Sequence, residues 1–364
     1  MAGIYVHFPF CHAKCAYCDF YSLGSRRLAP EFADRAAAEV APRLKELGGQ
    51  KVTTVYFGGG TPSSLAPGQL AKVVEALPMS QVEEFTIEVN SEDVNAANAA
   101  AWRSLGANRI SMGVQSLIDT ELRAVGRRHT AAEALKAVDT LRGAGFDNIS
   151  LDLIYGLPGQ TMQTWERSLD GVLATGVSHL SAYLLSYEPG TPLTRRLERG
   201  LVAEASEATA EAMYSLLCAK TAAAGMEHYE ISSFARPGRR SRHNSSYWDL
   251  TPYLGIGPGA HSLGADGTRR RHTPDLKAWL ADPLAIETEE ESPEEALDDL
   301  LIIRLRTAEG LDLATLAADR RAELLEAAAP ALKTGRLTLE QGCLRIPADH
   351  WLTADAIIRP LLFG

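Results

Sequence analysis

The chain has 364 residues, of which 46% are hydrophobic and 23% charged, as is usual for globular proteins with large buried cores. A formal net charge of −10 argues against a non-specific nucleic-acid binder, which would need a basic face. No apolar run approaches the roughly 18 residues that span a bilayer, and the first residues lack the basic and apolar regions of a secretory signal. We therefore expect a cytoplasmic protein with two domains, or with one barrel and an extension.

Six apolar runs in the first half of the chain are predicted to form strands, at residues 4–8, 53–57, 85–89, 109–113, 149–154 and 179–185. Segments with helical spacing separate them, at residues 31–47, 67–77, 131–143 and 163–174. Strands that are continuously apolar, rather than alternating, suit a parallel sheet covered by helices. The pattern predicts an α/β fold with a partial TIM-type (β/α)6 barrel.

Polar or glycine residues stand where these strands end. In such barrels the chemistry gathers at the carboxyl ends of the strands. The residues are, in strand order, Cys11, the run Gly58-Gly59-Gly60-Thr61, Glu88, Gln115 and Asp152. Their placement predicts one common site.

The pattern changes after about residue 190. Residues 204–224, 294–305, 312–328 and 354–362 are predicted to be helices, and residues 335–346 a hairpin that turns at Gln341-Gly342. Helices followed by a hairpin indicate a small α+β, winged-helix-like C-terminal domain. We place the two domains at residues 1–235 and 236–364, and expect the second to act as a lid or docking unit.

Cys11, Cys15 and Cys18 form a CxxxCxxC motif. A structural zinc site needs four ligands, and only His12 lies nearby as a fourth donor. A disulfide is disfavoured because the chain has five cysteines, an odd number, and no secretory signal. Three cysteines can instead bind three irons of a [4Fe–4S] cluster and leave the fourth iron open to a substrate or cofactor. This spacing is typical of the radical S-adenosylmethionine (SAM) superfamily, in which the open iron binds SAM. We expect Cys218 and Cys343 to be core residues.

Three motifs carry a more specific resemblance. They are Tyr5-Val-His-Phe-Pro-Phe-Cys11 with Cys15-Ala-Tyr-Cys18-Asp-Phe-Tyr, Gly58-Gly-Gly-Thr-Pro-Ser63, and His243-Asn-Ser-Ser-Tyr247-Trp248, which matches the pattern HNxxYW. With these motifs the chain resembles, over nearly its full length, the oxygen-independent coproporphyrinogen III oxidase group of radical SAM proteins. Within that group it is most similar to the HemW haem-chaperone branch.

The resemblance implies a set of ligand-binding residues. Those that would contact SAM are Tyr5, Tyr17, Gly59, Gly60, Thr61, Glu88, Gln115, Arg127 and Asp152. A surface position for the Arg127 side chain remains an alternative. Haem iron needs an axial donor, for which His243 is the first candidate and His261 the second. Either histidine could instead make a hydrogen bond that orders a loop.

Two departures separate the branches. The oxidases have a fourth cysteine two residues after the third, where this chain has Phe20, and an N-terminal extension before the motif. We therefore expect a haem chaperone that binds haem and a SAM-ligated [4Fe–4S] cluster and delivers haem to acceptor haemoproteins such as respiratory enzymes. An oxygen-independent coproporphyrinogen III oxidase is the alternative, and a radical SAM enzyme for another tetrapyrrole is a third possibility.

Overall fold

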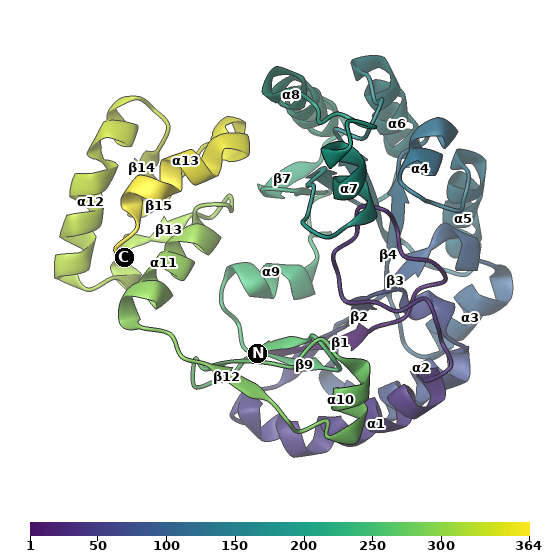
Figure 1. The fold of residues 1–364 in the computed structure, drawn as a ribbon. Coiled ribbons are helices and arrows are strands. Elements are labelled where there is room, and N and C mark those ends of the chain that lie inside the picture. Colours follow the sequence, from purple (N-terminus) through teal and green to yellow (C-terminus); the bar gives the residue numbers. More distant parts are fainter.

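A sheet of twelve strands runs through the computed structural model, which describes residues 1–364 (Figure 1). Six strands, β1 to β6, lie side by side in chain order and are parallel. They are β1 (Ala2–Phe8), β2 (Val52–Gly59), β3 (Glu84–Asn90), β4 (Arg109–Gln115), β5 (Asn148–Tyr155) and β6 (His179–Leu184). All six predicted strands are therefore confirmed.

Helices cover the outer face of these strands (Figure 1). They are α1 (Ala29–Arg43), α2 (Pro67–Ala76), α3 (Ala96–Ser104), α4 (Asp119–Ala124), α5 (Ala131–Gly143) and α6 (Met162–Ala174). Local signals set their ends. For example, α5 begins with a capping box between Thr130 and Glu133, in which each side chain accepts the other residue's backbone N–H. The four predicted helices are confirmed. The short helices α3 and α4 were not predicted.

The sheet continues beyond the six predicted strands at both edges. On one side β9 (Tyr253–Ile256) pairs in parallel with β1, and the antiparallel strands β10 (His261–Leu263), β11 (Arg269–Arg271) and β12 (Glu287–Glu289) follow. On the other side β8 (Ser233–Ala235) and β7 (Glu227–Glu230) pair antiparallel beyond β6. The edge strands β12 and β7 do not pair with each other, so the barrel is open, as predicted.

A buried polar network explains why the segment from β9 to β11 joins this sheet. Arg43 of α1 donates to the carbonyl of Gly255 at 2.6 Å, and Glu39 accepts from the backbone N–H of Gly257 at 3.1 Å. Glu39 also lies 2.6 Å from His272. The predicted domain boundary at residue 235 therefore falls inside the sheet. The division into two domains stays a prediction, and the topology favours a boundary after β12.

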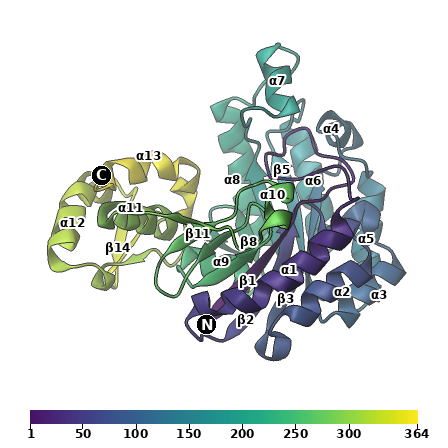
Figure 2. The same ribbon diagram turned by 60° about the horizontal axis from the view of Figure 1, so that its bottom comes forward.

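The C-terminal unit lies to one side of the large sheet in both ribbon views (Figures 1 and 2). Its elements are α11 (Pro293–Arg304), β13 (Leu311–Asp312), α12 (Ala318–Lys333), β14 (Thr338–Glu340), β15 (Cys343–Arg345) and α13 (Ala354–Ile358). The predicted hairpin is confirmed, and Gln341 and Gly342 at its turn both have positive φ, 53° and 81°. Such a two-residue turn matches the twist of the strands that it joins.

The helix predicted at 312–328 is wrong in its position. Asp312 belongs to β13 and its side chain accepts from the N–H of Ala314, so the helix begins only at Ala318. A single cluster of 68 buried hydrophobic residues extends from the sheet into the C-terminal unit. The two parts therefore share a core. No helix is both long enough and apolar enough to cross a membrane.

The remaining helices lie in the segments that join strands β6 to β12. They are α7 (Pro192–Glu198), α8 (Glu207–Ala223), α9 (Arg242–Trp248) and α10 (Leu276–Ala281). The helix predicted at 204–224 is α8. The HNxxYW motif forms α9, which packs on α11 and against β1 and β2. The position of α9 matters because it forms one wall of the cavity described below.

Candidate cofactor site and adjoining cavity

A cavity of about 470 Å³ lies at the carboxyl ends of the parallel strands and brings together the side chains predicted to form one site. Eleven predicted residues line it: Cys11, Cys15, Tyr17, Cys18, Gly59, Gly60, Thr61, Glu88, Gln115, Arg127 and Asp152. Tyr5 lies outside this lining, on the wall of a neighbouring cavity. The convergence follows from parallel strands whose carboxyl ends share one edge.

The three cysteines of the CxxxCxxC motif are free thiols on the wall of this cavity. The Thr61 hydroxyl donates to Cys11 Sγ at 3.4 Å, and Arg127 Nη1 donates to Cys15 Sγ at 3.5 Å. Cluster thiolates each bind a different iron, and hydrogen bonds to their sulfurs tune a cluster. The thiol and donor set fits a [4Fe–4S] cluster.

The Arg127 side chain lies on the wall of the cavity rather than on the surface. Its Nη2 donates to Asn90 Oδ1 at 2.9 Å and to the Gly113 carbonyl at 2.6 Å. Its Nε is buried and has no hydrogen-bond partner. The guanidinium therefore ties the ends of β3 and β4 to the cysteine loop. Asn90, whose side-chain amide also donates to Thr61, is a contributor that the sequence motifs did not indicate.

The glycine run is explained by close backbone contact. A Cβ atom at Gly60 would lie 2.6 Å from the carbonyl oxygen of Phe10 and 2.7 Å from that of Phe8. Gly59 has φ 97°, and a Cβ there would lie 2.5 Å from His7 Nδ1. Only glycine can take this path. The run thus holds the loop after β2 against the segment that leads into the cysteines, and its predicted contact with SAM stays a prediction.

Two carboxyl groups face the cavity, Glu88 from β3 and Asp152 from β5, with β4 between these two strands. Glu88 accepts from Tyr56 Oη at 2.8 Å and from the Gly59 N–H at 3.1 Å. Burial raises the pKa of Glu88 to about 7 and that of Asp152, which accepts from Ser111, to about 6. Both groups can therefore donate or accept a hydrogen bond near neutral pH. That suits them to hold the polar groups of a small ligand.

Gln115 adopts a strained backbone at the end of β4. Its φ is 69°, and the pairing of β4 with β5 is irregular between Gly113 and Gln115. The bulge turns the Gln115 side chain into the cavity, against Gly113, where a Cβ would lie 2.8 Å from the amide nitrogen. Such non-glycine strain clusters at functional sites. The sequence predicted the residue but not its conformation.

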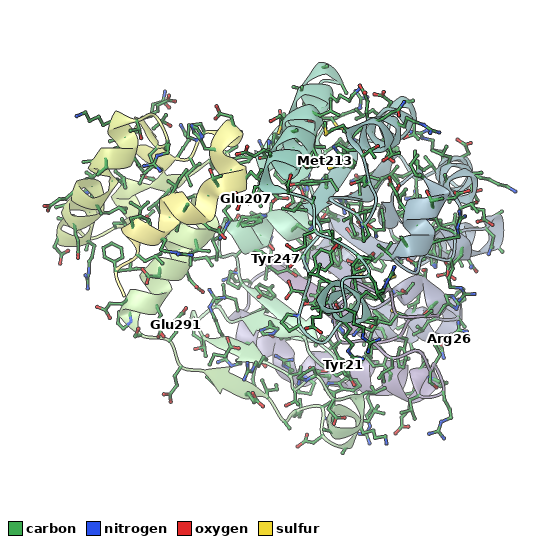
Figure 3. The ribbon with its side chains drawn as sticks, turned by 45° about the horizontal axis from the view of Figure 1, so that its top comes forward. Tyr21, Arg26, Glu207, Met213, Tyr247 and Glu291 are labelled. Carbon is green, nitrogen blue, oxygen red and sulfur yellow. The ribbon has the colours of Figure 1, made fainter.

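A second, wider cavity of about 1220 Å³ adjoins the first. The two share Asp19, Phe20, Glu88 and Tyr183 in their linings. Aromatic side chains make up much of the second wall: Tyr5, Tyr21, Tyr56, Tyr183, Tyr247, Trp248 and Tyr253. Tyr21 and Tyr247 are labelled in Figure 3, Tyr247 between the C-terminal unit and the sheet. Phe20 is 62% exposed where the cavities meet. Most of these aromatic residues were not predicted, since they come together only when the strands pair.

The two histidines predicted as candidate haem ligands have different environments. His243 is fully buried and lines neither cavity, and both ring nitrogens are engaged, 2.9 Å from Thr54 Oγ1 and 2.9 Å from Tyr247 Oη. Burial lowers its pKa to about 3, so the ring is neutral. His261 instead lies exposed on the wall of the wider cavity. His261 is therefore accessible from the cavity and His243 is enclosed in hydrogen bonds, and the choice of haem ligand stays a prediction.

The open α/β barrel, the cysteine motif and the glycine loop define a radical SAM protein. The Radical SAM superfamily profile matches residues 5–171, and this superfamily implies SAM and a [4Fe–4S] cluster as cofactors. The chain belongs to the HemW family. It is 36% identical to "Heme chaperone HemW" of Mycobacterium tuberculosis (strain ATCC 25618 / H37Rv), over 99% of this chain and 94% of that protein.

Two further relatives agree with this assignment. The chain is 34% identical to "Heme chaperone HemW" of Bacillus subtilis (strain 168), over 85% of each protein. Among solved structures, coproporphyrinogen III oxidase (HemN) from Escherichia coli, a radical SAM enzyme, superposes with a TM-score of 0.83 at 23% identity, covering 100% of this chain and 90% of that one. This last likeness concerns the fold.

Proposed function

We propose that the protein is a haem chaperone that binds haem in the wider cavity, beside a SAM-ligated [4Fe–4S] cluster, and delivers it to acceptor haemoproteins. The observation that carries the proposal is the aromatic-lined cavity of about 1220 Å³ next to the cysteine-lined one. A macrocycle is flat and largely apolar, and aromatic side chains pack well on such faces. The names of the HemW relatives support the same ligand.

The cofactors would occupy the smaller cavity. Cys11, Cys15 and Cys18 would hold the cluster, and the SAM contacts carried over from the resemblance would come from the lining residues around Glu88 and Asp152. A SAM-ligated cluster supplies one-electron chemistry when it is bound. The chain itself contributes donors from Thr61 and Arg127 to the sulfurs, and carboxyl groups for a polar ligand.

The alternative is an oxygen-independent coproporphyrinogen III oxidase. The contact between the two cavities favours it, because a tetrapyrrole in the wider cavity would reach Glu88 and Tyr183 on the shared wall. Phe20 counts against it, because an exposed apolar ring lies on that shared wall at the position where the oxidases have a fourth cysteine.

The test uses the full chain with its cluster reconstituted under anaerobic conditions. Haem titration should give a saturable Soret band, and the loaded protein should transfer its haem to an apo-haemoprotein faster than free haem binds that acceptor. The same preparation is then incubated with SAM, a reductant and coproporphyrinogen III. Porphyrin product formed together with 5′-deoxyadenosine would establish the oxidase and refute the chaperone. The absence of haem binding would refute the chaperone alone.

A further inference from the structure

The three-stranded extension β10–β12 presents one continuous face to the wider cavity. In its antiparallel pairs, His261 lies opposite Arg271, which lies opposite Glu287. Leu263, Arg269 and Glu289 form the neighbouring row. Directly opposite residues project from the same side of a sheet, with their Cβ atoms about 5 Å apart. Five of these six residues line the cavity: His261, Leu263, Arg269, Arg271 and Glu287. We call these six residues the β10–β12 face.

The imidazole on this face is free to bind a ligand. His261 Nδ1 is 3.9 Å from Glu289 Oε1, beyond hydrogen-bond distance, and the side chain is 58% exposed. Because the ring makes no hydrogen bond to Glu289, its tautomer is not fixed, and either unprotonated ring nitrogen can bind a metal. Two other histidines line this cavity: His7 has both ring nitrogens engaged, with Tyr5 and with the Tyr21 carbonyl, and His272 is buried with its Nε2 2.6 Å from Glu39.

The two arginines on the face are already paired with carboxylates. Arg271 Nε is 2.9 Å from Glu287 Oε2 and 3.6 Å from Glu289. Arg269 Nη2 is 2.8 Å from Asp299, and its Nε is buried without a hydrogen bond, 3.5 Å from Glu291. A carboxylate ligand would have to compete with these acids for the guanidinium groups. This competition lowers the affinity of the face for the carboxylate ligand and favours release of that ligand.

We propose that the β10–β12 face is the part of the cavity that recognises an iron tetrapyrrole with carboxylate side chains. His261 supplies the axial nitrogen to the iron, and Arg271, with Arg269 beside it, binds the carboxylates by displacing Glu287 and its acidic neighbours. The planar guanidinium matches a carboxylate in two parallel hydrogen bonds. This assignment rests on the proposed function. It adds the residues that would bind the ligand and the replacement of protein carboxylates by ligand carboxylates at the arginines.

The test compares haem with its dimethyl ester, in which both carboxylates are blocked, on the cluster-reconstituted full chain. We expect Arg271→Gln to weaken haem binding about tenfold, equivalent to about 1.4 kcal/mol, and to change binding of the diester by less than twofold. Glu287→Gln removes the competing acid and should tighten haem binding severalfold. His261→Ala should shift the Soret maximum and weaken both ligands. Arg239→Gln, at an exposed pair with Asp147, is the matched control and should change none of these values.

Each result is decisive. An unchanged Soret maximum and affinity in His261→Ala would overturn the axial assignment, and an equal loss for haem and diester in Arg271→Gln would overturn the carboxylate assignment. Arg271→Lys keeps the charge but cannot form two parallel hydrogen bonds to a carboxylate. If the assignment holds, its loss of haem affinity is intermediate, and this variant replaces Arg271→Gln if that variant does not fold. If the wild-type chain binds neither ligand, the proposed function fails. If it binds both but the variants behave like the control, only this inference fails.

Discussion

Replacing His243 by alanine should destabilise the protein strongly without changing how haem iron is ligated. The imidazole bridges β2 and α9, with Thr54 Oγ1 and Tyr247 Oη each 2.9 Å from a ring nitrogen. It also stacks on Tyr56, with ring centroids 5.2 Å apart. The substitution removes all three interactions at a fully buried position.

The magnitude follows from the groups left behind. A buried hydroxyl that loses its partner costs about 1–3 kcal/mol, and an aromatic stack contributes about 0.5–1.5 kcal/mol. Because Tyr247 is only half-buried, its hydroxyl can regain water. Together these two losses lead us to expect that His243→Ala lowers the free energy of unfolding by about 2–4 kcal/mol. Tyr247→Phe, which leaves only one ring nitrogen unpaired, should cost about 1–2 kcal/mol.

Urea unfolding followed by circular dichroism measures these losses, and a double-mutant cycle isolates the coupling between His243 and Tyr247, expected to be about 1 kcal/mol. His243→Gln, whose amide can replace one of the two hydrogen bonds, is the milder variant for ligand work. We expect its Soret maximum to match that of the wild type, because both ring nitrogens of His243 already have hydrogen-bond partners. A shifted Soret maximum in His243→Gln, or a loss below about 1 kcal/mol in His243→Ala, would refute this reasoning.

Three further predictions concern the cluster, the core and pH. Cys15→Ala should abolish bound iron and sulfide after reconstitution, whereas Cys343→Ala should leave both unchanged; equal iron contents in the two variants would contradict the cluster assignment. Glu39→Ala leaves Arg43 buried without one of its carboxylates and should lower the free energy of unfolding by about 3–5 kcal/mol, measured with urea. Asp34→Ala, at an exposed ion pair, should lower it by less than about 1 kcal/mol. Similar losses in the two variants would contradict a buried charge network. Burial lowers the folded-state pKa of five histidines. Their contribution to the free energy of unfolding is therefore complete above the unfolded pKa of about 6.5 and is lost as the pH falls toward 4. The loss is at most about 1.4 kcal/mol per histidine and pH unit. The raised pKa values of Glu88 and Asp152 oppose this slope, and a free energy of unfolding that rises from pH 6.5 to pH 5 would show that the histidines do not dominate. The five histidines are His7, His129, His179, His228 and His243.

The common site at the strand ends could be predicted from local sequence information. Polar residues or glycines lie within or shortly after each apolar run, and parallel pairing brings the carboxyl ends of the runs to one edge. The order of runs and polar residues along the chain is therefore enough to assign Cys11, Glu88 and Asp152 to a single site, and they line the same cavity. The cysteine spacing carries its own chemistry, because three closely spaced thiols suit a cluster with an open iron.

The accessibility of the two candidate haem ligands, His243 and His261, could not be predicted from local sequence information. His243 stands in the more distinctive motif and was the first candidate as ligand, yet its ring nitrogens are satisfied by Thr54 and Tyr247, 189 and 4 residues away in the chain. His261 stands in a glycine-rich run, and its exposure on the cavity wall follows from the pairing of β10 with β11. Hydrogen-bond partners far apart in sequence decide whether a nitrogen is free.

The sequence by itself determined the six parallel strands, most of the helices, the cysteine motif and the family, because periodicity, turn residues and motif spacing are local properties of the chain. Only the tertiary structure decided that the segment from β9 to β12 extends the same sheet, since that pairing depends on Glu39 and Arg43 contacting residues more than 200 positions away. It also decided which aromatic side chains enclose the wider cavity. Those residues come from strands and helices along the whole chain, and no single segment carries the pattern that unites them.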